Sequence, residues 1–158
     1  MLNDETRKAI SLNPNFADKQ LLGDLAELFA GKEEALCFLK LYGDYGELVD
    51  DQVDESKDIN RTQEIDRLKM ELSVNPYFLK NYTALWIVER LVHNTFFDSV
   101  KWEKSNSEWK RRDAKALSHC GYMMLFAVIL IEFGMEELNK FSLRFREHAH
   151  LKHLNDPI

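Results

Sequence analysis

The sequence is poor in glycine, proline and cysteine, and these shortages exclude several classes of protein. It has 6 glycines and 3 prolines among 158 residues, too few for an all-β fold, which needs a turn about every ten residues. The two cysteines, Cys37 and Cys120, show no CxxC spacing and cannot form a zinc site by themselves. We therefore expect two buried thiols in a protein of the cytoplasm.

An excess of basic charge and a long apolar run are also missing. The 27 acidic residues outnumber the 21 lysines and arginines and give a net charge of -6, which disfavours nucleic-acid binding because that needs a basic surface. The longest apolar run, residues 120–131, is shorter than the roughly 20 residues that cross a bilayer. The first ten residues include acids and lack an apolar core, so we expect no signal peptide and no membrane partner.

Apolar residues recur at helical spacing along almost the whole chain. Hydrophobic residues make up 45% of the sequence, and no stretch alternates as a strand would. The pattern predicts an all-α, single-domain bundle of six or seven helices spanning residues 1–158, with a short helix at 4–12 and a core bundle at 17–154. The expected helices of that bundle are residues 17–30, 32–56, 62–72, 76–104, 106–133 and 136–154.

Two of these expected helices contain more apolar surface than one small bundle readily covers. Residues 120–131 are apolar on every side, which is typical of a central helix. Residues 78–102 are rich in aromatic side chains that are spread around the helix. We therefore predict that a second copy covers part of this surface in a two-fold homodimer.

Acidic residues form a stripe along the helix expected at residues 32–56. The spacings of 3, 4, 3 and 4 residues place on one face Asp44, Glu47, Asp51, Asp54 and Asp58. Asp50 adjoins this stripe. Like charges at these spacings repel by a few tenths of a kcal/mol per pair, so we expect a solvent-exposed face that binds a cationic counterpart.

The same segment, residues 48–56 (LVDDQVDES), resembles the first aspartate-rich motif of the trans-prenyl diphosphate synthases, an all-α family. The resemblance implies that Asp50, Asp51 and Asp54 hold Mg²⁺, which in that family grips the diphosphate of the substrate. No second aspartate-rich motif follows in this chain, and the basic residues that usually follow the first are reduced to Arg61.

A basic group begins the helix expected at residues 106–133, with Arg111, Arg112 and Lys115 as its candidate phosphate-binding residues. Arg112 and Lys115 are equally able to pair with the acidic stripe of the same chain. A second candidate is the pair Glu89 and His93, which are four residues apart within an aromatic surface. We expect this pair to be a satisfied polar pair, in the core or partly exposed at the end of the bundle, since an unpaired buried charge is costly. The functional alternative is that the two residues supply two metal ligands or an acid-base couple.

Two functions from different classes follow from these patterns. The first is a non-catalytic, acidic protein-interaction module, with an inhibitor, immunity-type or assembly role, that associates with itself and binds a basic partner through the 44–58 stripe. The alternative is a Mg²⁺-dependent enzyme that acts on a diphosphate ester through the DDxxD-like helix. The first needs no cofactor, and the second needs Mg²⁺.

Overall fold

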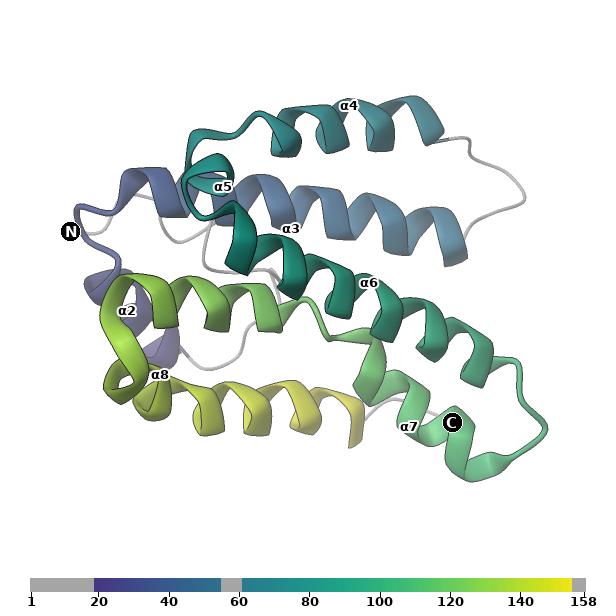
Figure 1. Cartoon of the computed structure of the whole chain (residues 1–158). Coiled ribbons are helices and arrows are strands. Elements are labelled where there is room, and N and C mark those ends of the chain that lie inside the picture. The colour runs from purple at the N-terminus through teal and green to yellow at the C-terminus, as the bar shows by residue number, and fades with distance from the viewer. Residues whose placement is uncertain (1–18, 55–60, 155–158) are drawn as a thin grey trace. The chain divides into compact units, whose positions relative to one another are not determined.

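The protein is all-α, as the sequence predicts. A computed structural model (Figure 1) describes residues 19–54 and 61–154, and side chains within residues 20–54 and 61–148. This described part contains no strand and seven helices: α2 (Lys19–Leu28), α3 (Glu33–Asp54), α4 (Thr62–Ser73), α5 (Pro76–Lys80), α6 (Tyr82–Glu103), α7 (Glu108–Ser118) and α8 (Tyr122–Leu154). The helix expected at residues 4–12 lies outside the described residues.

The described helices form two compact units. The first comprises Leu22–Tyr82 and contains α3, α4, α5 and most of α2. The second comprises residues 19–21 and 83–154 and contains α7, α8 and all of α6 but its first residue. The single domain over residues 1–158, with its core bundle at 17–154, stays a prediction.

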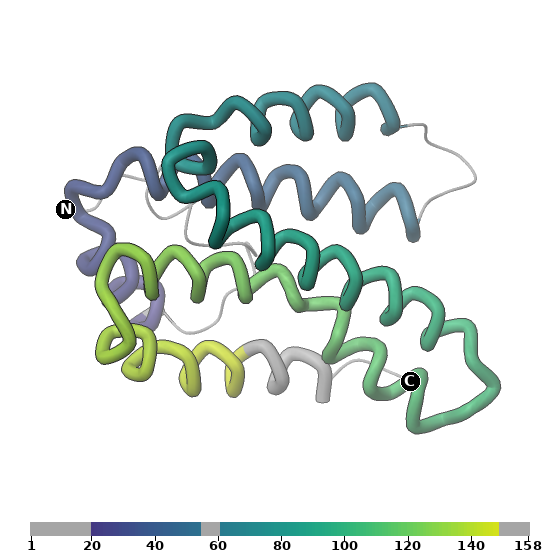
Figure 2. The backbone as a smooth tube through the Cα atoms, in the orientation of Figure 1, coloured from purple at the N-terminus to yellow at the C-terminus, as the bar shows by residue number. Residues whose placement is uncertain are grey.

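The core of the first unit is built on one aromatic side chain of α3. Phe38 is fully buried, and its ring centroid lies 6.0 Å from that of Tyr42, 5.6 Å from Tyr77 and 6.1 Å from Phe78. Helix α4 packs antiparallel along α3 (Figure 2) and buries Leu68 and Leu72. Burial of this face, more than helix propensity, holds α3 and α4 together.

The buried stripe of α3 differs from the predicted one in its second half. The sequence pattern places Gly46 inward, but Gly46 is exposed and Tyr45 is buried instead. The ring of Tyr45 packs 6.3 Å from that of Tyr42. Adjacent helical positions are about 100° apart, so this aromatic contact turns the buried stripe away from Gly46.

The helix expected at residues 76–104 is two helices. Its beginning is confirmed, because the side chain of Asn75 accepts hydrogen bonds from the amides of Tyr77 and Phe78 at 3.0 and 3.2 Å. The break comes at Asn81, whose side-chain amide donates to the Tyr77 carbonyl at 3.1 Å. The Asn81 backbone amide donates to the same carbonyl at 3.2 Å, so Asn81 caps the end of α5, and α6 begins at Tyr82.

The helix expected at residues 106–133 is also divided. Helix α7 ends at Ser118, whose hydroxyl donates to the Lys115 carbonyl at 2.9 Å, and α8 begins after Gly121. The first half of α8 supplies much of the core of the second unit through Met124, Leu125, Phe126, Val128 and Ile129. It is not covered on all sides, since Met123 and Leu130 are exposed.

Gly134 interrupts α8, and its position confirms the predicted helix end. Its φ of 84° and ψ of -179° are not helical. Only glycine adopts this region of φ and ψ without strain, because it has no Cβ. The helical segments before and after Gly134 are therefore separate, as the sequence predicts.

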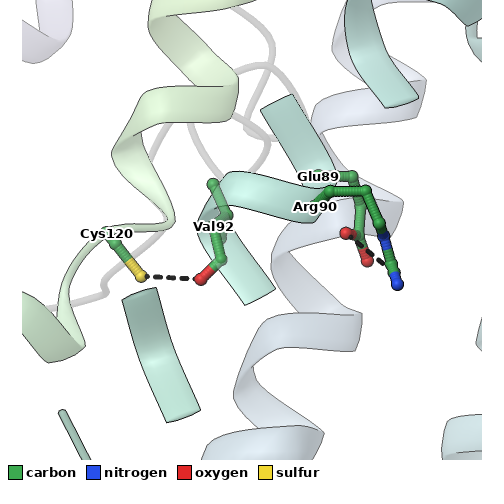
Figure 3. Close-up of polar contacts among 4 residues, drawn as sticks. All are labelled: Glu89, Arg90, Val92 and Cys120. Atoms are coloured by element: carbon green, nitrogen blue, oxygen red, sulfur yellow. Dashed lines mark hydrogen bonds and ion pairs between the residues drawn. The ribbon is translucent and has the colours of Figure 1, made fainter. Parts of the chain in front are cut away.

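The two cysteines have different surroundings. Cys120 is buried, and its thiol donates a hydrogen bond to the Val92 carbonyl at 3.3 Å (Figure 3). Burial raises the pKa of this thiol to about 11. Cys37, which the sequence analysis expects to be buried, is exposed, because the buried stripe of α3 passes through its neighbours Leu36 and Phe38.

We expect a thiol reagent to modify Cys37 alone in the folded protein. The thiolate is the reactive form, and burial with a raised pKa keeps Cys120 protonated. Labelling with iodoacetamide near pH 8, followed by peptide mass spectrometry, measures each site. The Cys37→Ser variant should then remain unlabelled until denaturant is added. Rapid labelling of Cys120 in the folded variant would contradict the described burial.

Within the described residues, no single helix is both long enough and apolar enough to cross a membrane. Helix α7 and residues 122–148 are long and apolar enough only when taken together, and a bend of 41° separates them.

Candidate functional site

Helix α3 has an acidic face, defined here as Asp44, Glu47, Asp50, Asp51 and Asp54. Four of these side chains are exposed, and Asp51 is half-exposed. The last residue of the predicted stripe, Asp58, lies outside the described residues. The structure therefore places the described carboxylates at the surface of the first unit.

The helix geometry explains why these carboxylates share one face. Residues three or four positions apart lie one above the other along a helix, which aligns Asp44, Glu47, Asp51 and Asp54. With a rise of 1.5 Å per residue, the row extends over about 15 Å. The opposite side of α3 is occupied by the apolar cluster around Phe38, so solvent is the environment of the row.

The acidic face raises the pKa of one of its own members. The pKa of Glu47 lies above its ordinary value of 4.5, first because of partial burial and then because of the negative charges of Asp44 and Asp51. Glu47 therefore ionises less readily on the folded helix. Burial, which disfavours the ionised form, is the larger cause of this raised pKa, and the like charges of Asp44 and Asp51 add to it.

Replacing Glu47 with glutamine should raise the melting temperature at pH 7. A raised folded pKa means that the folded chain binds the proton more tightly, so ionised Glu47 destabilises the fold at neutral pH. Removing its two like-charge pairs should contribute about half a kcal/mol. The gain should vanish as the pH falls below 4.5, where Glu47 is protonated in both states.

Thermal melting followed by circular dichroism at several pH values measures this difference. The matched control is Glu27→Gln, because Glu27 is an exposed acid of α2 outside the acidic face. A gain from Glu47→Gln that is equally large below pH 4 would show that charge repulsion is not its cause.

One cation of the same unit neutralises part of the acidic face. The Nη1 nitrogen of Arg61 lies 2.9 Å from Oδ2 of Asp51, and the Arg61 backbone amide donates to the Gln52 side-chain oxygen at 2.7 Å. Arg61 directly precedes α4, so this pair connects the end of α3 with the beginning of α4. Asp44, Glu47 and Asp54 make no ion pair with other described residues.

The contacts described for the predicted basic residues of α7 are with groups other than the acidic face. Arg111 donates to the Ser105 carbonyl at 2.7 Å, and Arg112 lies 3.5 Å from the carboxylate of Asp113. Lys115 is half-buried. These residues belong to the second unit, whereas the acidic face belongs to the first.

Glu89 is half-buried and His93 lies at the surface, so His93 is not a core residue. Glu89 accepts a hydrogen bond from the guanidinium of Arg90 at 3.2 Å (Figure 3), and that guanidinium lies 4.6 Å from the ring centre of Trp86. His93 is exposed, with its ring 4.7 Å from that of Phe97. The face of α6 that holds His93 is a surface, because the helix buries only Leu85 and Ser99.

Much of the apolar surface of α6 is exposed. Trp86, Ile87 and Leu91 are 42%, 56% and 61% exposed. The sequence analysis expects a second copy to cover apolar surface of this helix. Exposed apolar side chains close together are typical of protein-protein contact sites.

A second charged surface lies at the turn between α6 and α7, and the sequence pattern singled out only its last two residues, Arg111 and Arg112. The segment 101–112 (KWEKSNSEWKRR) contains five basic residues and two tryptophans. The signal was present in the sequence as basic residues interleaved with tryptophan. The segment as a whole was not recognised as one surface, because it was divided between two expected helices.

The described residues of the acidic face do not form a three-ligand metal site. Among the side chains that the structure describes, no three from histidine, cysteine, aspartate and glutamate are placed to hold one metal ion. Asp51 of the DDxxD-like motif is bound to Arg61.

Comparison with protein-family models, with curated proteins and with solved structures finds no match. The function is therefore argued from the chain's own surfaces.

Proposed function

We propose that this chain is a non-catalytic protein-interaction module that associates with itself and binds a basic partner through the acidic face of α3. The observation that carries this proposal is the set Asp44, Glu47 and Asp54, which are exposed and form no ion pair with other described residues. The like charges of Asp44 and Asp51, which add to the effect of burial in raising the pKa of Glu47, support it further, because a bound cation would offset their repulsion.

A row of exposed carboxylates suits recognition of a cationic surface. Charges of one sign steer an oppositely charged partner toward the row and raise the association rate. The attraction extends over about 8 to 10 Å at physiological salt and weakens as salt is added. The exposed apolar side chains of α6, including Ile87 and Leu91, are surface that association would help to cover.

The first test measures binding of a fluorescent oligolysine peptide by anisotropy at low salt. The triple variant Asp44→Asn, Glu47→Gln and Asp54→Asn should bind it about tenfold more weakly, because the paired charges are lost. The matched control is Glu27→Gln, Asp66→Asn and Glu147→Gln. These control residues are exposed acids outside the acidic face, so both triple variants have the same net charge.

The control should bind the peptide within about twofold of the wild-type chain. An equal loss of affinity in both variants would mean that oligolysine senses net charge alone, and the proposed surface would then be wrong.

The Mg²⁺-dependent enzyme makes a different prediction. Mg²⁺ and pyrophosphate would raise the melting temperature, because they would bind the folded state. This rise would vanish when Asp50, Asp51 and Asp54 are changed to asparagine. We place this alternative second because the Arg61 guanidinium already binds Asp51. A Mg²⁺-dependent rise of this kind would replace the proposed function.

A further inference from the structure

The turn between α6 and α7 concentrates positive charge in an acidic chain. The α6–α7 tip is defined here as residues 101–112. Its five basic and two acidic residues give it a net charge of +3, so the rest of the chain, whose total is -6, carries -9. The chain therefore carries separate surfaces of opposite sign.

The α6–α7 tip is held in one conformation by its own contacts. Arg111 reaches back from α7 and donates to the Ser105 carbonyl at 2.7 Å. The Ser107 amide donates to the Ser105 hydroxyl at 3.2 Å. The indoles of Trp102 and Trp109 pack edge to face with centroids 5.3 Å apart. A surface ordered in advance loses less entropy when it binds.

Cationic and aromatic groups of the α6–α7 tip remain accessible. Lys104 is exposed, and the ammonium of Lys110 lies 5.7 Å from the ring centre of Trp109. Neither lysine forms an ion pair with other described residues. Trp109 is 50% exposed. Tryptophan beside cationic side chains is a combination that often dominates binding energy in protein interfaces.

We propose that the basic partner of the acidic face is a second copy of this chain, which binds it through the α6–α7 tip. This proposal rests on the proposed function, because it names the partner of the same acidic face. Charge complementarity carries it: Lys104 and Lys110 on one copy are opposite in sign to Glu47 and Asp54 on the other. Exposed Gly46 beside the acidic face leaves open space, since no atom lies within 4 Å of a Cβ built there.

The contact joins two different surfaces, so each copy contributes one surface of each kind. This property gives the proposal a specific test. A copy whose acidic face is neutralised still has its α6–α7 tip, and a copy whose tip is neutralised still has its acidic face. Neither variant can bind itself, but the two can bind each other.

The experiment uses two variants of the full chain in sedimentation velocity at about 50 mM NaCl, where surface charges are weakly screened. The face variant is Asp44→Asn, Glu47→Gln and Asp54→Asn. The tip variant is Lys104→Gln and Lys110→Gln. Each variant alone should sediment as a monomer of 18.6 kDa, and their equimolar mixture should form a dimer.

The matched controls remove equal charge elsewhere. The control for the face variant is Glu27→Gln, Asp66→Asn and Glu147→Gln, and the control for the tip variant is Lys69→Gln and Lys80→Gln. All of these residues are exposed, and both controls should associate as the wild-type chain does. Circular dichroism verifies that every variant is folded.

Fluorescence gives an independent measure of the contact. Association should move the tryptophan emission of the wild-type chain to shorter wavelength, because the half-exposed Trp109 becomes covered. The Trp109→Phe variant should lose most of this shift. An unchanged shift in that variant would place the contact elsewhere.

Three results would overturn the inference. The first is a wild-type chain that remains monomeric at about millimolar concentration, where even weak contacts form. The second is a mixture that associates no more than its components. The third is binding of the α6–α7 tip to phosphatidylserine vesicles, lost in the tip variant, without any self-association, which would identify a lipid surface as the occupant.

The outcomes also separate this inference from the proposed function. If the mixture stays monomeric while the face variant still loses affinity for oligolysine, the second copy is not the partner and the acidic face remains a binding surface. If the face variant binds oligolysine as well as its control does, both proposals are wrong.

Discussion

Replacing Phe38 with alanine is expected to lower the free energy of unfolding by about 3 to 5 kcal/mol, as removal of a buried aromatic ring usually does. Phe38 is fully buried and contacts the rings of Tyr42, Tyr77 and Phe78. Alanine would leave a cavity where α3 and α5 meet. Because small domains are stable by only about 5 to 15 kcal/mol, this loss would remove much of the stability that holds the acidic face in place.

Urea unfolding followed by circular dichroism measures this change. The matched control is Leu79→Ala on α5, the short helix whose rings contact Phe38, since Leu79 is 54% exposed and its truncation should change stability by at most about 0.5 kcal/mol. A Phe38→Ala variant as stable as the control would contradict the aromatic core of the first unit.

Replacing Gly134 with alanine should lower the free energy of unfolding by about 1 to 3 kcal/mol. Gly134 has a φ of 84° and a ψ of -179°, a conformation that a side chain with a Cβ rarely adopts. The cost comes from backbone strain and not from crowding, since no atom lies within 4 Å of a Cβ built there. The effect should appear in the unfolding of the second unit.

The matched control is Gly46→Ala, whose effect on the free energy of unfolding should have the opposite sign. Gly46 lies inside α3, is exposed and has open space around it. Alanine is favoured over glycine in a helix by up to about 1 kcal/mol, so Gly46→Ala should stabilise the chain. Equal effects at both positions would contradict the described break in α8.

Sequence patterns predict helices well where short-range signals agree with packing. Asn75 and Pro76 begin a helix because the Asn75 side chain caps it, and Gly134 ends one because glycine accepts a positive φ. The pattern fails at Asn81, which caps the end of α5 with two hydrogen bonds to the Tyr77 carbonyl although the apolar spacing continues into α6. The spacing of apolar residues does not predict such side-chain hydrogen bonds.

The candidate site could be predicted in part. The spacing of Asp44, Glu47 and Asp54 already places them on one face of a helix. The pairing of Asp51 with Arg61 could not be read from the sequence, since it depends on where the chain returns to α3. The exposure of His93 was missed for a similar reason, because an apolar helix surface does not by itself reveal which side is covered.

The most direct test of the acidic face is a residue-resolved titration by nuclear magnetic resonance. Unlabelled oligolysine is added to the ¹⁵N-labelled chain at low salt, and the amide shifts are followed. We predict that the largest shifts occur at residues 44–54 and that they diminish as salt screens the charges. Shifts that are spread evenly over all exposed acids, or that are largest outside α3, would contradict the binding surface proposed for this protein.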